Sequence, residues 1–258
     1  MTELPTIIKI KRIVDEAEDV KTFFFDYKID FEPGQFFILW IPGLDEKPFA
    51  ISHQNKEEIG MTIHKVGEFT KKLFLMKKGD KIGIRGPYGK GFSIKKSKSC
   101  VVGGGVGVAE LSILINKLKD PVIINGARSK NNLVFLDRFK AHITTDDGSL
   151  GEKGFTTDVF SKLLETEKFD VVYTCGPEIM MKKIFEICEK HNIELQVSME
   201  RYMSCGFGVC GKCMCNDQIV CKDGPVFDSK KLRKMSEFGE SARLRTGKKA
   251  TLKEYYGK

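Results

Sequence analysis

Short apolar runs separated by turn residues fill the first part of the chain. The runs are rich in Ile, Phe, Thr and Val, and turn signals such as Glu32-Pro33-Gly34 and Lys78-Gly79-Asp80 stand between them. Six short strands at this spacing predict a small antiparallel β barrel over residues 1–96, with one short helix at residues 69–76. The strands are predicted at residues 6–14, 20–28, 35–41, 49–53, 60–65 and 81–85.

The pattern changes near residue 97 to strands that alternate with helices. An apolar strand at residues 100–102 runs into a glycine-rich loop, and apolar side chains then recur at helical spacing. Such alternation predicts a parallel sheet with crossover helices, here an α/β domain over residues 97–197. Further strands are predicted at residues 121–127, 141–144, 169–174 and 193–197, helices at 108–119, 157–164 and 177–191, and a helical turn at 135–139.

Glycines and cysteines crowd the third segment, residues 198–230. This segment is too small to bury a core of its own, so we expect a metal cluster to hold it together. The tail that follows, residues 231–258, carries much of the net charge of +8. A basic tail could bind nucleic acid or an acidic partner, but no nucleic-acid-binding motif lies beside it. We therefore expect no nucleic acid and favour a solvated tail or a peripheral helix.

Composition excludes several classes of protein. No apolar run reaches the roughly 18 residues that a membrane span needs, so we expect no membrane association. Residues 1–11 lack the apolar core of a signal peptide, which predicts a cytoplasmic protein. Eight cysteines in such a chain argue against a disulfide scaffold, and a cluster of them indicates metal binding.

Four cysteines have the spacing of a plant-type [2Fe–2S] ligand set. Cys205-x4-Cys210-x2-Cys213, with Cys221 beyond, matches that pattern. Thiolates suit iron because they are soft, anionic donors. The glycines between them let the backbone wrap closely and turn its N–H groups toward the cluster sulfurs. The sequence therefore predicts a [2Fe–2S] cluster.

Other interpretations of the cysteines remain open. A structural zinc site would favour paired Cys-x2-Cys motifs with a longer separation, and one such pair is present. Cys215 could replace Cys213 as the third ligand, although we assign Cys215 a non-ligand role. Cys100 and Cys188 lie in apolar strand and helix patterns and are predicted to be core residues.

A glycine-rich loop joins the first strand of the α/β domain to its first helix. The loop Gly103-Gly104-Gly105-Val106-Gly107 would let a pyrophosphate rest on free N–H groups, although its spacing is not G-x-G-x-x-G. By itself it could be an ordinary tight turn. A second loop, Cys175-Gly176-Pro177, also follows a strand and opens a helix. Because ligands in such sheets bind at the carboxyl ends of strands, the two loops together predict a dinucleotide site.

The order of these features resembles the ferredoxin–NADP reductase superfamily. Glu200-Arg201-Tyr202-Met203-Ser204-Cys205-Gly206 and Val220-Cys221-Lys222-Asp223-Gly224-Pro225-Val226-Phe227 resemble, more narrowly, the electron-transfer subunit of class B dihydroorotate dehydrogenase. So does Thr145-Asp146-Asp147-Gly148-Ser149. The resemblance covers about residues 5–230, and the cysteine motif with its Asp-Gly-Pro-Val-Phe continuation is the most specific part of it.

The resemblance implies that the barrel binds FAD. The family's Arg-Pro-x-Ser motif would fall on Lys47-Pro48-Phe49-Ala50. Lys47 keeps a positive charge for phosphate but loses the bidentate fork of arginine. Ala50 lacks the hydroxyl group that would face the flavin. In an extended strand, Ser52 would share the face of Ala50.

Two further segments complete the implied flavin site. Residues 66–70 resemble the family's phosphate-binding turn, in which Gly67 permits a close approach and Thr70 would donate a hydrogen bond to phosphate. Gly86 and Pro87 begin the loop that closes the barrel near the flavin.

The resemblance also implies an electron route and a partner. Cys175 would help to position the nicotinamide ring, and the partner would be a catalytic subunit with FMN that oxidises dihydroorotate, with two copies of each subunit. Electrons would pass from FMN through [2Fe–2S] and FAD to NAD+, in the biosynthesis of UMP. Because a nicotinamide exchanges a hydride and a cluster exchanges single electrons, FAD must lie between them. Arg128 and Lys130 could meet a 2′-phosphate, so the choice between NAD and NADP stays open.

Two other functions stay open. The chain could serve a different flavin and iron–sulfur oxidoreductase, of the transhydrogenase or sulfide dehydrogenase type. It could instead be a metal-binding regulator that uses its basic tail, which would be a colourless zinc protein without flavin.

Overall fold

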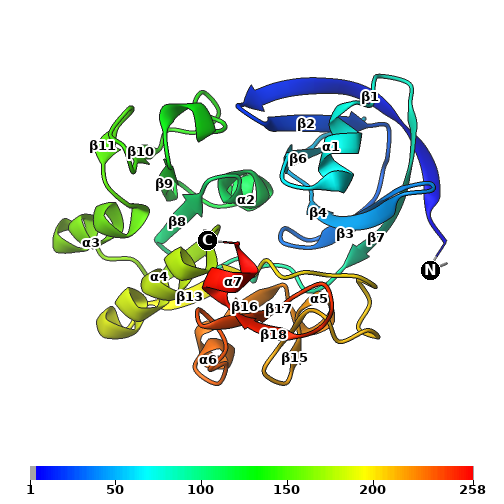
Figure 1. Cartoon of the computed structure of the whole chain (residues 1–258). Helices are drawn as coiled ribbons and strands as arrows, with labels where there is room; N and C mark the ends of the chain where they lie inside the picture. The colour runs from blue at the N-terminus through cyan, green and yellow to red at the C-terminus, as the bar shows by residue number, and fades with distance from the viewer. Residues whose placement is uncertain (1–3, 258) are drawn as a thin grey trace.

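The structure is a computed structural model that describes residues 4–257. Figure 1 shows the antiparallel strands of the N-terminal part in blue and cyan and the alternating strands and helices of the next part in green and yellow. The C-terminal part, in orange and red, lies along both of them. None of the helices among the described residues is long and apolar enough to cross a membrane.

The N-terminal part is an antiparallel sheet in the order β4-β3-β7-β1-β2-β6-β5. Phe23, Phe25, Phe37, Leu39 and Met61 are fully buried in its core. A single helix, α1 (Glu68–Phe74), packs Phe69 and Leu73 against this core. The strands are β1 (Thr6–Ala17), β2 (Val20–Phe25), β3 (Phe36–Ile41), β4 (Asp45–Ala50), β5 (His53–Gln54), β6 (Ile59–His64) and β7 (Lys81–Tyr88).

The second part is a parallel sheet, as predicted, with one antiparallel strand at its edge. Its order is β11-β10-β9-β8-β12-β13-β16, and β16 pairs with β13 in the antiparallel sense. The strands are β8 (Ser99–Gly104), β9 (Val122–Ala127), β10 (His142–Thr145), β11 (Glu152–Lys153), β12 (Val171–Cys175), β13 (Glu194–Ser198) and β16 (Val226–Asp228).

Helices cover both faces of the parallel sheet. The side chains of α2 (Gly107–Ile115) pack with Val101 and Tyr173 in one core cluster, and Ile113 reaches the core of the antiparallel sheet. The helices α3 (Thr156–Thr166) and α4 (Glu178–His191) pack in a second cluster with Cys100 and Val172. The helix α2 therefore joins the two sheets, and the predicted core positions of Cys100 and Cys188 are confirmed, since both are fully buried.

Two local predictions were wrong. The strand predicted at residues 49–53 is divided, because β4 already ends at Ala50 and β5 begins at His53. The helical turn predicted at residues 135–139 is a non-helical turn, because Phe135 has a left-handed φ of 60° that no right-handed helix accommodates. A short 3₁₀ helix, η1 (Lys130–Asn132), precedes it.

The C-terminal part is folded against the rest of the chain. It consists of β14 (Met214–Cys215), β15 (Gln218–Ile219), α5 (Val220–Asp223), α6 (Ser229–Leu232), β17 (Ser241–Arg243), β18 (Lys249–Thr251) and α7 (Leu252–Tyr255). Leu232, Met235, Phe238 and Leu252 are all buried. The expectation of a solvated tail or peripheral helix was therefore wrong, because these apolar side chains outweigh the many lysines between them.

Candidate redox site

Three of the predicted ligand cysteines lie in the loop at residues 205–213 and Cys221 lies in α5, and backbone N–H groups are directed at the sulfurs of Cys205 and Cys213. The N–H groups of Val209 and Cys210 donate to Cys205 Sγ at 3.4 and 3.5 Å, and that of Cys221 donates to Cys213 Sγ at 3.4 Å. The glycines between the cysteines, Gly206, Gly208 and Gly211, all have positive φ angles that L-residues with side chains rarely adopt. The prediction that these glycines turn donors toward sulfur agrees with this geometry.

The same hydrogen bonds favour the anionic form of two of the cysteines. Burial raises the pKa of Cys205, but the N–H groups of Cys210, Phe207 and Val209 outweigh it and lower that pKa to about 6. Hydrogen bonding from Cys221 lowers the pKa of Cys213 to about 7. Iron binds the thiolate form, so this donor set fits an iron–sulfur cluster.

Cys215 lies in a different environment. It is fully buried, and its sulfur accepts a hydrogen bond from Arg201 Nη2 at 3.4 Å. Burial raises the pKa of Cys215 to about 12, so this thiol stays protonated. The hydrogen bond from Arg201, rather than the pKa, supports Cys213 over Cys215 as the third ligand, because hydrogen bonding with Cys213 and burial also raise the pKa of the predicted ligand Cys221.

The two loops of the predicted dinucleotide site are in direct contact at the carboxyl edge of the parallel sheet. A Cβ atom on Gly107 would lie 2.3 Å from the carbonyl oxygen of Cys175, and a Cβ on Gly176 would lie 2.8 Å from that of Gly104. The strands before the loops, β8 and β12, are neighbours that pair Gly103 with Cys175. Residues 107 and 176 must therefore be glycine for the two loops to meet. Pro177 follows directly and is the N-cap residue of α4.

Cys175 is surrounded by acidic groups that the sequence did not reveal. Its Sγ lies 3.2 Å from Glu110 Oε2 and 4.0 Å from Glu200 Oε1, and the hydroxyl of Ser198 donates to Glu110 Oε1. Burial and Glu110 raise the pKa of Cys175 well above its usual value, so it is a neutral thiol rather than a nucleophile. Burial and the neighbouring Glu110 also raise the pKa of Glu200 to about 7.

The residues predicted to bind the FAD phosphates line one small pocket of about 250 Å³. Lys47, Gly67 and Thr70 all contribute to it, although they come from β4 and the start of α1. Lys47 Nζ pairs with Asp45 Oδ2 at 2.5 Å. The pocket also contains Arg245, from the turn between β17 and β18. Asp45 and Glu68 also line the pocket, so its charges balance, and Lys47 and Arg245 are the two side chains that could pair with an anionic pyrophosphate.

Thr70 has a different role from the predicted one. Its hydroxyl oxygen accepts hydrogen bonds from the N–H groups of Val66 and Gly67 at 2.9 and 3.0 Å, and its proton is donated to the carbonyl of Gly67. The hydroxyl therefore closes the turn itself and has no proton left for a phosphate. Thr70 therefore shapes the pocket, and Lys47 and Arg245 are its two candidate phosphate contacts.

The remaining flavin residues lie on three adjacent strands. Ala50 on β4 and Tyr88 on β7 both pair with Phe36 on β3, so the motif at residues 47–50 lies close to Gly86 and Pro87. The ring of Phe49 lies 5.9 Å from that of Phe69. These contacts bring together the segments that the resemblance assigned to one flavin.

Ser52 does not share the face of Ala50. Because β4 ends at Ala50, the two-residue periodicity of a strand no longer applies. Ser52 is fully buried, and its hydroxyl lies 2.7 Å from that of Thr62 and 3.2 Å from the carbonyl of Gly60. This hydroxyl cannot replace the one that Ala50 lacks.

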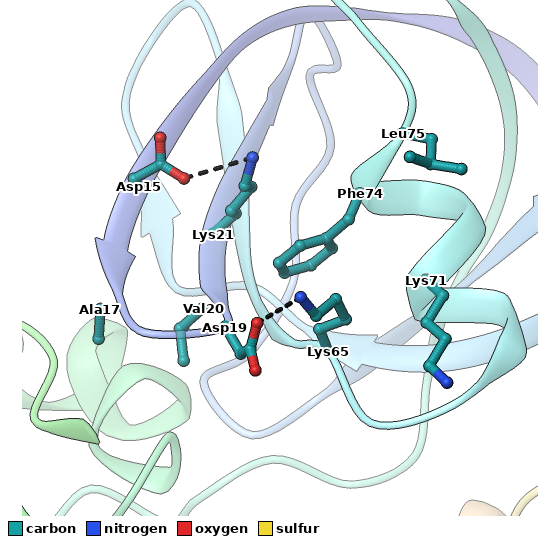
Figure 2. Close-up of a pocket in the computed structure, with 9 residues that line it drawn as sticks. All are labelled: Asp15, Ala17, Asp19, Val20, Lys21, Lys65, Lys71, Phe74 and Leu75. Carbon is teal, nitrogen blue, oxygen red and sulfur yellow. Dashed lines mark ion pairs between the residues drawn. The ribbon is translucent and has the colours of Figure 1, made fainter. Parts of the chain in front are cut away.

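A second depression lies away from all these residues. Figure 2 shows this depression of about 570 Å³ at the end of the β1–β2 hairpin, between Phe74 of α1 and the two acidic residues Asp15 and Asp19. Lys21 and Lys65 pair with these acids, so its charges are largely matched internally. None of the predicted site residues lines it.

Comparison with known proteins identifies the family. A sequence model described as the iron-sulfur cluster binding domain of dihydroorotate dehydrogenase B matches residues 200–233. A Methanocaldococcus jannaschii protein named "Probable dihydroorotate dehydrogenase B (NAD(+)), electron transfer subunit" is 50% identical over 257 residues, covering 96% of this chain and 98% of the relative. The chain belongs to this family. A Pyrococcus horikoshii protein of the same name is 44% identical and covers 93% of this chain and 96% of the relative.

Solved structures agree with the fold. The structure of the NADH-dependent reduced ferredoxin-NADP oxidoreductase, from work on flavin-based electron bifurcation, matches with a TM-score of 0.82 and 30% identity, over 94% of this chain and 95% of that one. A ferredoxin NADP+ reductase from Neisseria gonorrhoeae matches with a TM-score of 0.64 at 17% identity, over 74% of this chain and 92% of that one. These comparisons confirm the prediction of an oxidoreductase subunit of the dihydroorotate dehydrogenase B family. They also confirm its FAD- and NAD-binding fold and its iron–sulfur segment.

Substitution of Cys215 and Cys213 by serine distinguishes the third ligand. We expect Cys215→Ser to keep the normal paramagnetic signal of the reduced cluster, because Arg201 rather than iron holds that sulfur. We expect Cys213→Ser to lose or strongly change the signal, since it removes one of four thiolates. Electron paramagnetic resonance of both variants, purified without oxygen, is the measurement. The reverse pattern would show that Cys215 is the ligand.

Removal of the Arg245 side chain tests the pocket. We expect Arg245→Ala to raise the Kd for FAD about five- to tenfold, because it removes a charge-assisted contact worth about 1 kcal/mol at an exposed site. Lys248→Ala is the matched control, because Lys248 lies in the same turn but does not line the pocket. Flavin fluorescence during titration of the flavin-free protein gives both constants. Equal Kd values for Arg245→Ala and the wild type would contradict the assignment.

Proposed function

We propose that this chain carries electrons from an FMN-containing subunit that oxidises dihydroorotate, through its [2Fe–2S] cluster and FAD, to NAD+. The observation that carries the proposal is the position of the cysteine loop. Gly206 packs against Ile38 on the flavin side, while Val209 and Cys210 on the same loop are exposed. A cluster in this loop would lie between the flavin and the outside of the protein.

The residues of the chain bind and orient, and the cofactors supply the redox chemistry. When bound, FAD exchanges a hydride with the nicotinamide and single electrons with the cluster. The contact between Gly107 and Cys175 brings the dinucleotide loops together. The neutral thiol of Cys175 is fully buried beside Glu110 and Glu200, so it would shape the floor of the nicotinamide site rather than act by charge.

The surface around the cluster loop suits a protein partner. Phe207 and Val209 are 41% and 76% exposed, beside the exposed Cys210. Apolar side chains at an interface exclude water, and a cluster at such a surface shortens the electron path to the partner. We therefore place the FMN-containing subunit on this loop, in an assembly with two copies of each subunit.

The proposed setting is the cytoplasm, in the biosynthesis of UMP. None of the eight cysteines forms a disulfide, which fits a reducing compartment.

A related complex is the second candidate. The match to the NADH-dependent reduced ferredoxin-NADP oxidoreductase covers nearly the whole chain at 30% identity. Such a complex would use the same flavin and cluster but a different partner. Copurification from the native organism separates the two, because only the first candidate predicts a partner that oxidises dihydroorotate.

A cluster-free variant tests the electron route. We expect Cys210→Ser to abolish transfer from dihydroorotate to NAD+ in the reconstituted complex and to spare NADH oxidation by ferricyanide, because the dinucleotide meets FAD alone. Flavin content and circular dichroism must first show that the variant is folded, since the cluster also stabilises its segment. Normal transfer from dihydroorotate to NAD+ would mean that the cluster is only structural. Loss of ferricyanide reduction with FAD intact would place the cluster segment at the nicotinamide site.

A further inference from the structure

A buried arginine joins the flavin strands to the cluster loop. Arg85 on β7 has a side chain only 6% exposed. Its Nη2 donates to the backbone carbonyl of Cys205 at 2.8 Å and to Glu46 Oε1 at 2.5 Å, and its Nη1 donates to the hydroxyl of Tyr88 at 3.0 Å. One guanidinium group therefore contacts a predicted cluster ligand and two strands of the flavin site.

The charges at this junction are poorly screened. Arg85 is buried, and Glu46 has a side chain 30% exposed, so solvent and salt weaken their fields less than those of surface groups. The cluster gains one negative charge when it is reduced. A cation beside Cys205 therefore favours the reduced cluster, and an anion at Glu46 opposes it. Local charge and hydrogen bonding are among the factors that set the potential of such clusters.

Other contacts hold the cluster segment to the barrel without Arg85. The N–H of Lys90 donates to the carbonyl of Gly224 at 2.6 Å, and Lys90 forms a β-bridge with Pro225. Gly206 packs against Ile38 independently. Loss of the Arg85 charge should thus leave the segment in place, so an electrostatic effect can be measured apart from undocking.

We propose that Arg85 is a positioning residue that holds the cluster loop against the flavin strands and raises the reduction potential of the cluster, with Glu46 as the opposing charge. This rests on the proposed function, because it takes Cys205 as a cluster ligand. The pair matches the potential of the cluster to that of the flavin beside it. Arg85 acts through the Cys205 carbonyl and takes no part in the chemistry itself.

The test is a redox titration of the cluster in the full chain, purified without oxygen and followed by electron paramagnetic resonance. At the wild-type midpoint potential, we expect Arg85→Gln to lower the ratio of reduced to oxidised cluster about tenfold, which is ~59 mV for a one-electron couple. We expect Glu46→Gln to raise the same ratio. Arg85→Lys, which keeps the charge, should restore most of the wild-type value. Arg12→Gln is the matched control, because Arg12 on β1 also pairs with a buried glutamate, Glu58, which directly precedes β6.

Opposite shifts in Arg85→Gln and Glu46→Gln, with Arg12→Gln unchanged, support the proposal. Shifts in the same direction, or no shift in either variant, overturn it. If Arg85→Gln loses its cluster during purification, the direction of the Glu46→Gln shift decides alone. A wild-type protein without iron and labile sulfide would instead contradict the proposed function, so the two failures are distinguishable.

Discussion

The buried ion pair between Arg201 and Glu178 connects the parts of the molecule that the redox site requires. Both side chains are almost inaccessible, and Arg201 Nη2 lies 2.6 Å from Glu178 Oε1. Arg201 also donates to the carbonyl of Ser241, and Glu178 accepts from the N–H of Gly239. Removal of one partner from such a pair typically costs about 3–5 kcal/mol, because the other charge stays buried. These contacts link the start of α4, the cluster segment and the C-terminal hairpin.

This contact has consequences for each cofactor site. Glu178 opens α4 directly after Cys175-Gly176-Pro177, so the pair holds the loop expected at the nicotinamide. Arg201 also donates a hydrogen bond to the sulfur of Cys215, the cysteine that we do not assign as a ligand. The same hairpin carries Arg245 to the pocket that we predict to bind the FAD phosphates. The C-terminal residues are therefore packed against all three predicted cofactor sites.

Features that depend on a local sequence pattern could be predicted, whereas features that depend on contacts between distant segments could not. The strands, helices and cysteine spacing are local signals, and the antiparallel and parallel sheets followed from them. Arg245 gave no such signal, because it reaches its pocket from a distant segment, and no local pattern shows that Glu110 and Glu200 meet beside Cys175. The position of Glu110 in the first turn after the glycine loop was the one available hint. The prediction for the C-terminal tail was wrong because it rested on the charge of the tail. The spacing of Leu232, Met235 and Phe238, which are buried, was the signal that it left out.

The central claim is that NADH, FAD and the cluster form one electron path within this chain. Anaerobic titration of the isolated protein with NADH tests it most directly, with flavin absorbance and the paramagnetic signal of the cluster followed together. We expect NADH alone to bleach the flavin and to produce the signal of the reduced cluster. In Cys210→Ser we expect the flavin to bleach without that signal. The contrary result would be a wild-type protein in which NADH fully reduces the flavin while the cluster stays oxidised until dithionite is added. That result would contradict a single electron path from NADH through FAD to the cluster.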